Sequence, residues 1–167
     1  VILLENEGLL ETFARKGTQV RLVTSEDFAA HQFLREAMEC AAIKLLAGEP
    51  IQQKLPMLKA LAKEVDDSTW GTFEYFQADK NFHQALIDMC GNSRVSEEYR
   101  RISTLGLYVT LAHIRQDVPS NEDAPHSRLI TQLSTATPEE AAALIQRHIR
   151  CGKGSVPLSI PKGSKNA

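Results

Sequence analysis

The stretch that decides the fold is QADKNFHQALIDMCGN, residues 77–92, which carries a carboxylate and an imidazole at helical spacing. Asp79 and His83 stand four residues apart, so both side chains project from one face of a helix. The same face is expected to include Phe73, Phe76, Leu86 and Cys90. Because burying a charged or polar side chain without a partner costs several kcal/mol, we expect Asp79 and His83 to find partners inside the protein.

A second stretch, residues 126–149 with the sequence HSRLITQLSTATPEEAAALIQRHI, repeats this arrangement twice. The apolar positions at helical spacing are Leu129, Ile130 and Leu133 after His126, and Ala141, Leu144 and Ile145 before His148. Thr137, Pro138 and Glu140 are typical of a helix N-cap, its first turn and a capping box. His126 therefore opens one helix and His148 closes the next. If the two helices have similar lengths and fold back antiparallel, both histidines lie at the same end.

These patterns predict a metal site formed by Asp79, His83, His126 and His148. Imidazole and carboxylate ligands together suit zinc, nickel, iron or copper. A lone histidine on an apolar face is more often a core residue with satisfied hydrogen bonds, and the pattern alone leaves that interpretation open.

Composition limits the class of protein. A chain of 167 residues that is 43% hydrophobic can bury one core. A net charge of −2 gives no excess of positive charge that would indicate nucleic-acid binding. The sequence contains no run of eighteen apolar residues, so no membrane span is expected. The three cysteines are far apart and form no CxxC pair, which favours a reducing, cytoplasmic location.

Three segments are expected. Residues 1–23 read as two short strands around a glycine-containing turn, and such a hairpin is too small to be stable alone. Since no initiator Met is present either, we interpret the hairpin as the remnant of a domain cut off upstream. Residues 24–151 read as helices, and residues 152–167, rich in Gly, Ser, Pro and Lys, as a flexible tail.

Within residues 24–151 the expected helices follow from caps and stripes. The first begins after a cap at Thr24–Asp27, with an inward stripe predicted at Phe28, His31, Leu34, Met38, Ala41 and Leu45. The second is expected over residues 50–64, and the third after a cap at Ser68 or Thr69. A fourth covers residues 93–115, and a polar loop over 117–123 precedes the two histidine helices.

Four stretches resemble the GntR-type bacterial transcription regulators of the FadR branch. DKNFHQALIDMCGN (79–92) resembles the most specific signature of their C-terminal effector-binding domain, abbreviated FCD, and residues 126–149 resemble its closing helix pair. LREAMECAAIKLLA (34–47) resembles its first helix, and EGLLETFARKGTQVRLVTSED (7–27) is similar to the wing of the winged helix-turn-helix and its linker. The fold implied is all-α: an antiparallel bundle of about six helices, preceded by a short β-hairpin.

The resemblance also implies a function. In metal-binding members of that branch, one Asp and three His hold a divalent ion, and the matching residues here are Asp79, His83, His126 and His148. Zinc or nickel, one ion per chain, is the implied cofactor, with open positions for a small carboxylic acid effector. The implied partners are a second copy of the chain and DNA, bound through an N-terminal head that is missing here. Members that bind fatty acyl-CoA lack this histidine set, and Ala124-Pro125 stand where an acidic pair is common.

Two further questions stay open at the sequence level. Arg35 could hold an effector carboxylate, since guanidinium suits bidentate recognition, or could simply pair with Glu39 one turn later. A metalloenzyme or a structural dimerisation module are rivals to the regulator. The enzyme would need a base beside the metal, and the polar residues nearby, Lys80, Gln84 and Asp88, lie mostly off the face of Asp79.

Overall fold

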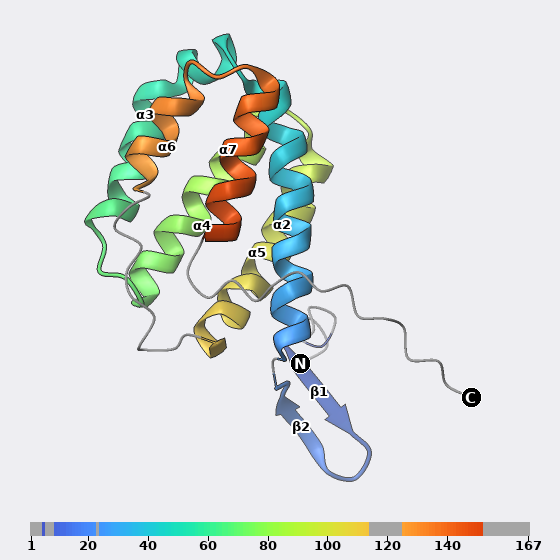
Figure 1. Cartoon of the computed structure of the whole chain (residues 1–167). Coiled ribbons are helices and arrows are strands. Elements are labelled where there is room, and N and C mark those ends of the chain that lie inside the picture. Colours follow the sequence, from blue (N-terminus) through green and yellow to red (C-terminus); the bar gives the residue numbers. More distant parts are fainter. Residues whose placement is uncertain (1–4, 6–8, 23, 114–124, 152–167) are drawn as a thin grey trace.

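The computed structural model describes residues 5, 9–22, 24–113 and 125–151, and for residues 108–113 and 151 it describes the backbone alone. These residues form a two-stranded hairpin and a bundle of six helices (Figure 1). The elements are β1 (Leu10–Phe13), β2 (Gly17–Val20), α2 (Ser25–Leu46), α3 (Glu49–Asp67), α4 (Phe73–Asp88), α5 (Ser93–His113), α6 (His126–Leu133) and α7 (Pro138–Cys151). The expected fold class is confirmed. The loop expected over 117–123 and the tail expected over 152–167 lie outside the described residues.

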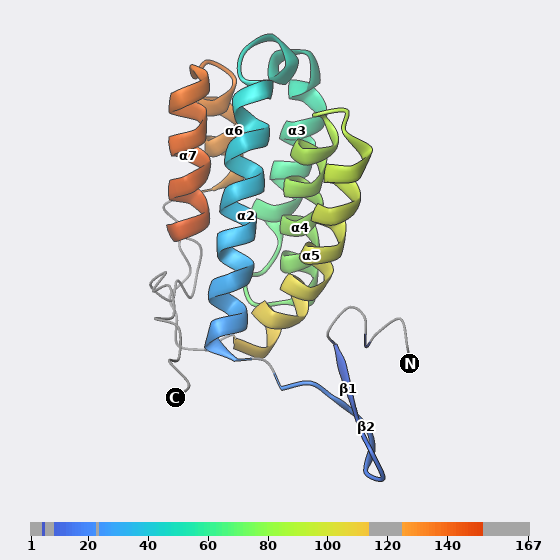
Figure 2. The same ribbon diagram turned by 90° about the vertical axis from the view of Figure 1, so that its right-hand side faces the viewer.

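The long helix α2 is the central element of the bundle. It packs along α7 on one side and against α4 and α5 on the other, while α3 lies against α4 and α6 (Figures 1 and 2). The hairpin is antiparallel, with Leu10 opposite Val20 and Phe13 opposite Gly17, and it projects from the end of the bundle where α2 begins. None of the helices in the described ranges is long and apolar enough to cross a bilayer.

The expected capping box starts α2. The Thr24 hydroxyl accepts a hydrogen bond from the backbone N–H of Asp27, and the Asp27 carboxylate accepts one from the backbone N–H of Thr24. Burial raises the pKa of Asp27, but these bonds and the ion pair with Arg21 outweigh it and hold the pKa below its usual value. The box therefore fixes both the start of α2 and its junction with the hairpin.

The same device starts α7. The backbone N–H of Thr137 donates to the Glu140 carboxylate at 2.9 Å, and the N–H of Glu140 donates to the Thr137 hydroxyl at 3.3 Å. The cap expected for α4 at Ser68 or Thr69 is wrong. Thr72 caps that helix, because α3 continues to Asp67, one turn beyond its expected end, and displaces the next start.

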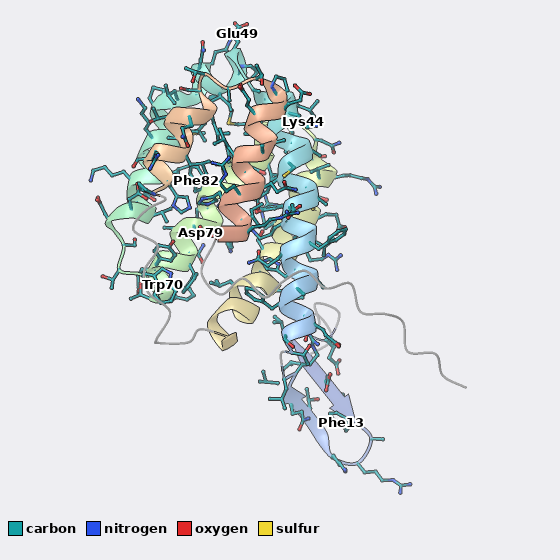
Figure 3. The ribbon with its side chains drawn as sticks, in the orientation of Figure 1. Phe13, Lys44, Glu49, Trp70, Asp79 and Phe82 are labelled. Atoms are coloured by element: carbon teal, nitrogen blue, oxygen red, sulfur yellow. The ribbon has the colours of Figure 1, made fainter. Side chains whose placement is uncertain are left out.

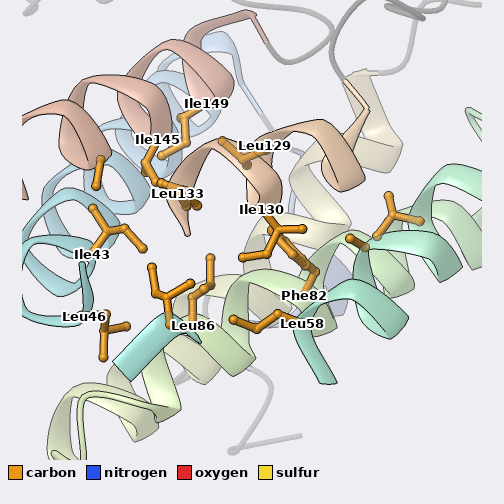
Figure 4. Packing of buried hydrophobic residues seen from close by; sticks show 14 residues of the cluster. Ile43, Leu46, Leu58, Phe82, Leu86, Leu129, Ile130, Leu133, Ile145 and Ile149 are labelled. Carbon is orange, nitrogen blue, oxygen red and sulfur yellow. The ribbon is translucent and has the colours of Figure 1, made fainter. Parts of the chain in front are cut away.

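A single large apolar cluster fills the bundle, with contributions from five helices (Figure 4). Its larger members are Ile43 and Leu46 on α2, Leu58 on α3, Phe82 and Leu86 on α4, Ile130 and Leu133 on α6, and Ile145 and Ile149 on α7. The apolar faces predicted for α6 and α7 are therefore confirmed.

The inward face of α2 differs from the predicted stripe. Leu34 and Leu45 are 43% and 74% exposed, so they do not belong to the core. The residues that face inward include Phe28, His31, Arg35, Glu39, Ala42, Ile43 and Leu46. Their spacing is equally helical, but two of them are charged, and a search for apolar residues alone passes over them. Phe73, expected on the inward face of α4, is 54% exposed because it begins that helix at the rim of the bundle.

Candidate metal centre

Asp79 and three histidines from three helices meet in the interior of the bundle. Asp79 and His83 come from α4, His126 from the start of α6, and His148 from the last turns of α7. Oδ1 of Asp79 lies 3.0 Å from Nε2 of His126 and 3.6 Å from Nε2 of His83. Nε2 of His148 lies 3.3 Å from Nε2 of His83. The structure thus brings together all four residues that the sequence singled out.

The separations of these donor atoms suit a metal ion. Ligand atoms at about 2.1 Å from a zinc ion and at tetrahedral corners lie about 3.4 Å from one another. The four donor atoms lie within 4.8 Å of one another, and the shorter separations are 3.0, 3.3 and 3.6 Å. One ion could therefore contact all four donor atoms once the widest pair moves closer together.

The helix pair α6 and α7 reaches this arrangement in a different way from the one expected. The two helices are 8 and 14 residues long, so the prediction of similar lengths is wrong. The rings of His126 and His148 nevertheless lie 4.6 Å apart between centroids, at 83° to one another. The prediction that this pair of helices brings His126 and His148 to the same end is therefore confirmed.

Two carboxylates hold the outer nitrogens of the rings. Oε2 of the buried Glu39 lies at ion-pair distance, 2.6 Å, from Nδ1 of His83, and neither atom has another partner among the described residues. Asp66, at the end of α3, lies 3.6 Å from Nδ1 of His126 and accepts the backbone N–H of that residue at 2.7 Å. Carboxylates in this position fix the ring tautomer, so that Nε2 faces the centre with its lone pair.

Glu39 is the hub of a wider network behind His83. Its Oε1 accepts hydrogen bonds from Nε of Arg35 at 2.9 Å and from the Tyr99 hydroxyl at 2.5 Å. Nη1 of Arg35 also lies 3.7 Å from Oδ2 of Asp79. The network thus links α2, α4 and α5 around the cluster and leaves Glu39 only 2% exposed.

Carboxylates dominate the charge of the cluster, and a bound cation would take the place of the proton that they hold on His126. Burial raises the pKa of Asp79, but the neighbouring His83, His126 and Arg35 outweigh it and hold the pKa well below its usual range. Burial lowers the pKa of His126, yet the carboxylates of Asp66 and Asp79 outweigh it and raise the pKa to about 9. Burial and the adjacent His83 and His126 lower the pKa of His148 to about 3, so its ring is neutral and able to act as a ligand.

The core and the cluster adjoin at Phe82, which is fully buried on α4. Its ring contacts the rings of His83 and His126 edge-on, at centroid distances of 5.2 and 5.1 Å. Figure 3 places Phe82 and Asp79 together on α4 inside the bundle, far from the hairpin with Phe13. This apolar wall limits water on one side of the cluster and strengthens the electrostatic interactions there.

A cavity opens on the other side of Asp79, between α2, α4 and α5. Its empty volume, open solvent included, is about 320 Å³, and its polar wall includes His31, Arg35, Lys80 and Ser103 besides Asp79. Burial and the neighbouring Arg35 lower the pKa of His31 to about 3, so the imidazole in this wall is neutral. Asp79 thus belongs both to the histidine cluster and to the wall of an open, partly polar cleft.

Comparison with known proteins identifies the family to which the chain belongs. Residues 32–150 match the FCD domain family, which is most of the chain. The chain belongs to the FCD family. This FCD domain is of the kind found in GntR-type transcription regulators of the FadR branch, a family of regulators rather than of enzymes.

Three relatives agree with that assignment. The FCD chain is 25% identical over 148 residues to the Nta operon transcriptional regulator of Aminobacter aminovorans, covering 88% of this chain and 70% of that protein. It is 32% identical over 95 residues to an HTH-type transcriptional regulator in an unstable DNA locus of Streptomyces ambofaciens, covering 57% of this chain and 40% of that protein. A crystal structure from Rhodococcus sp. RHA1, described as a GntR transcriptional regulator, shares the fold with a TM-score of 0.67 at 19% identity, over 90% of this chain and 73% of that one.

Sequence reasoning missed Glu39 and Asp66 as partners of the cluster. For Glu39 a signal exists, because it continues the helical series of Phe28, His31 and Arg35 on the inward face of α2. Asp66 gives no comparable signal. It stands beside Asp67 at the end of α3, and only the position of α6 brings His126 to it.

Proposed function

We propose that this FCD domain binds one divalent metal ion through Asp79, His83, His126 and His148, and senses a small carboxylic acid at that ion. The observation that carries the proposal is the convergence of one donor atom from each of these four side chains within 4.8 Å. The outer nitrogens of His83 and His126 face carboxylates, as in metal sites of proteins. A donor set of three imidazoles and one carboxylate favours zinc or nickel.

The effector site proposed is the cavity beside Asp79. A bound divalent ion supplies a Lewis-acidic centre to which an acid can bind. Arg35 lines the same cavity and lies 3.7 Å from Asp79, so its guanidinium is suitably placed for a carboxylate bound next to the ion. Its pairing with Glu39 uses Nε, which leaves other N–H groups of the guanidinium for the acid.

For the intact regulator, we infer a homodimer that contacts DNA through a winged helix-turn-helix head. The hairpin of β1 and β2 is interpreted as the wing of that head. A dimer reads two half-sites with one surface used twice, and binding of the acid would change how the two heads are held. The expected cytoplasmic location follows from this role.

The first experiment measures metal content. Protein stripped with a chelator and then exposed to zinc or nickel is expected to take up about one ion per chain and to unfold at a higher temperature. His83→Ala is expected to lose most of the uptake. His31→Ala is the matched control, because His31 is also a buried histidine of this region but stands outside the cluster, and it is expected to keep the ion.

The second experiment tests the acid. Hydroxy-, keto- and dicarboxylic acids are expected to raise the melting temperature of the metal-loaded protein and not of the stripped protein. Equal shifts in both forms would contradict a metal-bound effector. If the wild-type protein takes up neither zinc nor nickel, the histidines are core hydrogen-bonding groups and the rival of a structural dimerisation module is favoured.

A further inference from the structure

The cavity beside Asp79 is built from three helical stripes. α2 contributes His31 and Arg35, α4 contributes Phe76 and Lys80 around Asp79, and α5 contributes Tyr99, Ser103, Gly106 and Leu107. In each helix these positions are separated by three, four, seven or eight residues or are adjacent, so each helix presents one face to the cavity. The space that the wall encloses is only about 30 Å³, and most of the empty volume of about 320 Å³ is open to solvent. The cavity is therefore an open cleft, which suits a small acid that stays partly in solvent rather than a large cofactor.

Most polar groups in this wall are already engaged within the protein. The Tyr99 hydroxyl donates to Glu39, and the Ser103 hydroxyl donates to the backbone carbonyl of Tyr99 at 2.6 Å. Arg35 is partly engaged by Glu39 and lies close to Asp79. These contacts leave the cavity with few free donors for a ligand.

Among the charged side chains of this wall in the described residues, Lys80 is the exception. It lines the cavity and is half-buried, yet no ion pair or hydrogen bond joins it to the other described residues. An unpaired ammonium beside a cavity attracts an anion, and partial burial makes the interaction stronger than at an exposed surface. Lys80 also follows Asp79 directly in α4, so the cavity has a fixed cation next to the cluster and separate from Arg35.

We propose that Lys80 is a specificity-determining residue that binds a second anionic group of the effector, so that this domain selects dicarboxylic over monocarboxylic acids. This inference rests on the proposed function, because it assumes that the first carboxylate binds at the metal beside Arg35. Arg35 then recognises the end of the acid next to the cluster, and Lys80 recognises the other end. The apolar Phe76 and Leu107 in the wall suit the carbon chain between the two ends.

The test compares acids that differ only at the far end. Malate and 2-hydroxybutyrate share the same hydroxy acid group, and the first has a carboxylate where the second has a methyl group; 2-hydroxyglutarate and 2-hydroxyvalerate form a second, longer pair. Calorimetric titration of the zinc-loaded chain is expected to show that at least one diacid binds roughly tenfold or more tightly than its partner, as expected for a hydrogen bond to a charged group.

Variants assign this preference to Lys80. Lys80→Gln is expected to remove the preference while changing the affinity for the monoacid less than about twofold, and Lys80→Arg is expected to restore much of it. Lys59→Gln, at an exposed lysine on α3 outside the cavity, is the control and should behave as wild type. Zinc content is measured for each variant, because an unchanged content shows that Asp79 is undisturbed.

The outcomes separate this inference from the proposed function. If monoacids bind the zinc-loaded protein as tightly as their diacid partners, the inference is wrong and the metal-bound effector stands. If a diacid is preferred and Lys80→Gln keeps the preference, the second anion binds elsewhere and the inference is again wrong. If none of the four acids binds, the inference is contradicted, and the keto and other dicarboxylic acids of the second experiment decide the proposed function separately.

Discussion

Replacement of Glu39 by alanine is expected to destabilise the domain and weaken its metal site at the same time. Glu39 is 2% exposed. Its carboxylate oxygens lie 2.9 Å from Nε of Arg35, 2.5 Å from the Tyr99 hydroxyl and 2.6 Å from Nδ1 of His83. Without the carboxylate, the largely buried guanidinium of Arg35 loses its nearest negative charge. The Tyr99 hydroxyl and the His83 ring lose the oxygen atoms that they face. The variant removes a partner from a buried ion pair, which costs far more than removing the whole network.

The expected magnitude follows from these contacts. Breaking a buried ion pair by removing one partner costs about 3–5 kcal/mol. Because Arg35 keeps the negative charge of Asp79 nearby, we expect the lower end of that range. A loss of about 3 kcal/mol in the free energy of unfolding lowers the melting temperature by roughly 6–12 °C in a domain of this size. Loss of the group that orients His83 is expected to weaken zinc binding about 10- to 100-fold.

The assay is chemical unfolding of the metal-free protein, followed by zinc titration of the refolded variant. Glu98→Ala is the control: Glu98 pairs with Arg101 on α5, and the two side chains are 61% and 57% exposed. A surface ion pair contributes about 0–1 kcal/mol, so this control should lose little stability and keep its zinc affinity. If Glu39→Ala also unfolds within about 1 kcal/mol of wild type without metal, Glu39 is not the hub described and the reasoning is refuted.

Three further predictions concern the cavity, the start of α2 and the core. Gly106→Ala is expected to weaken effector binding without loss of zinc, because the added Cβ would lie 1.9 Å from Cε1 of His31 and would force that ring toward the cavity; unchanged acid affinity in calorimetry would count against this geometry. Asp27→Asn is expected to cost about 1 kcal/mol at neutral pH. Since the folded-state pKa of Asp27 is lowered, its contribution is present above about pH 4 and is lost as the pH falls through the folded-state pKa, so urea unfolding should show the two proteins converging in acid. Ile130→Ala, at a fully buried position, should cost about 2–5 kcal/mol, whereas Leu45→Ala, 74% exposed, should stay within about 0.5 kcal/mol in the same assay.

The sequence by itself determined the helices and the four residues of the cluster. Helical periodicity marks the inward faces of α6 and α7, and the capping box at Thr137 and Glu140 places the start of α7. Asp79 and His83 share a face because four residues make about one helical turn, which is a local property of the chain. Local rules of this kind need no knowledge of how the helices pack.

The tertiary structure alone decided which groups surround that cluster. Glu39 meets His83 across two helices, and Asp66 meets His126 at the junction of two others, so each contact depends on the relative height and rotation of packed helices. The inward face of α2 includes charged residues that only this network makes tolerable in the interior. Sequence periodicity fixes which residues share a face, but packing fixes which faces meet, and the cavity beside Asp79 exists only where three of them do.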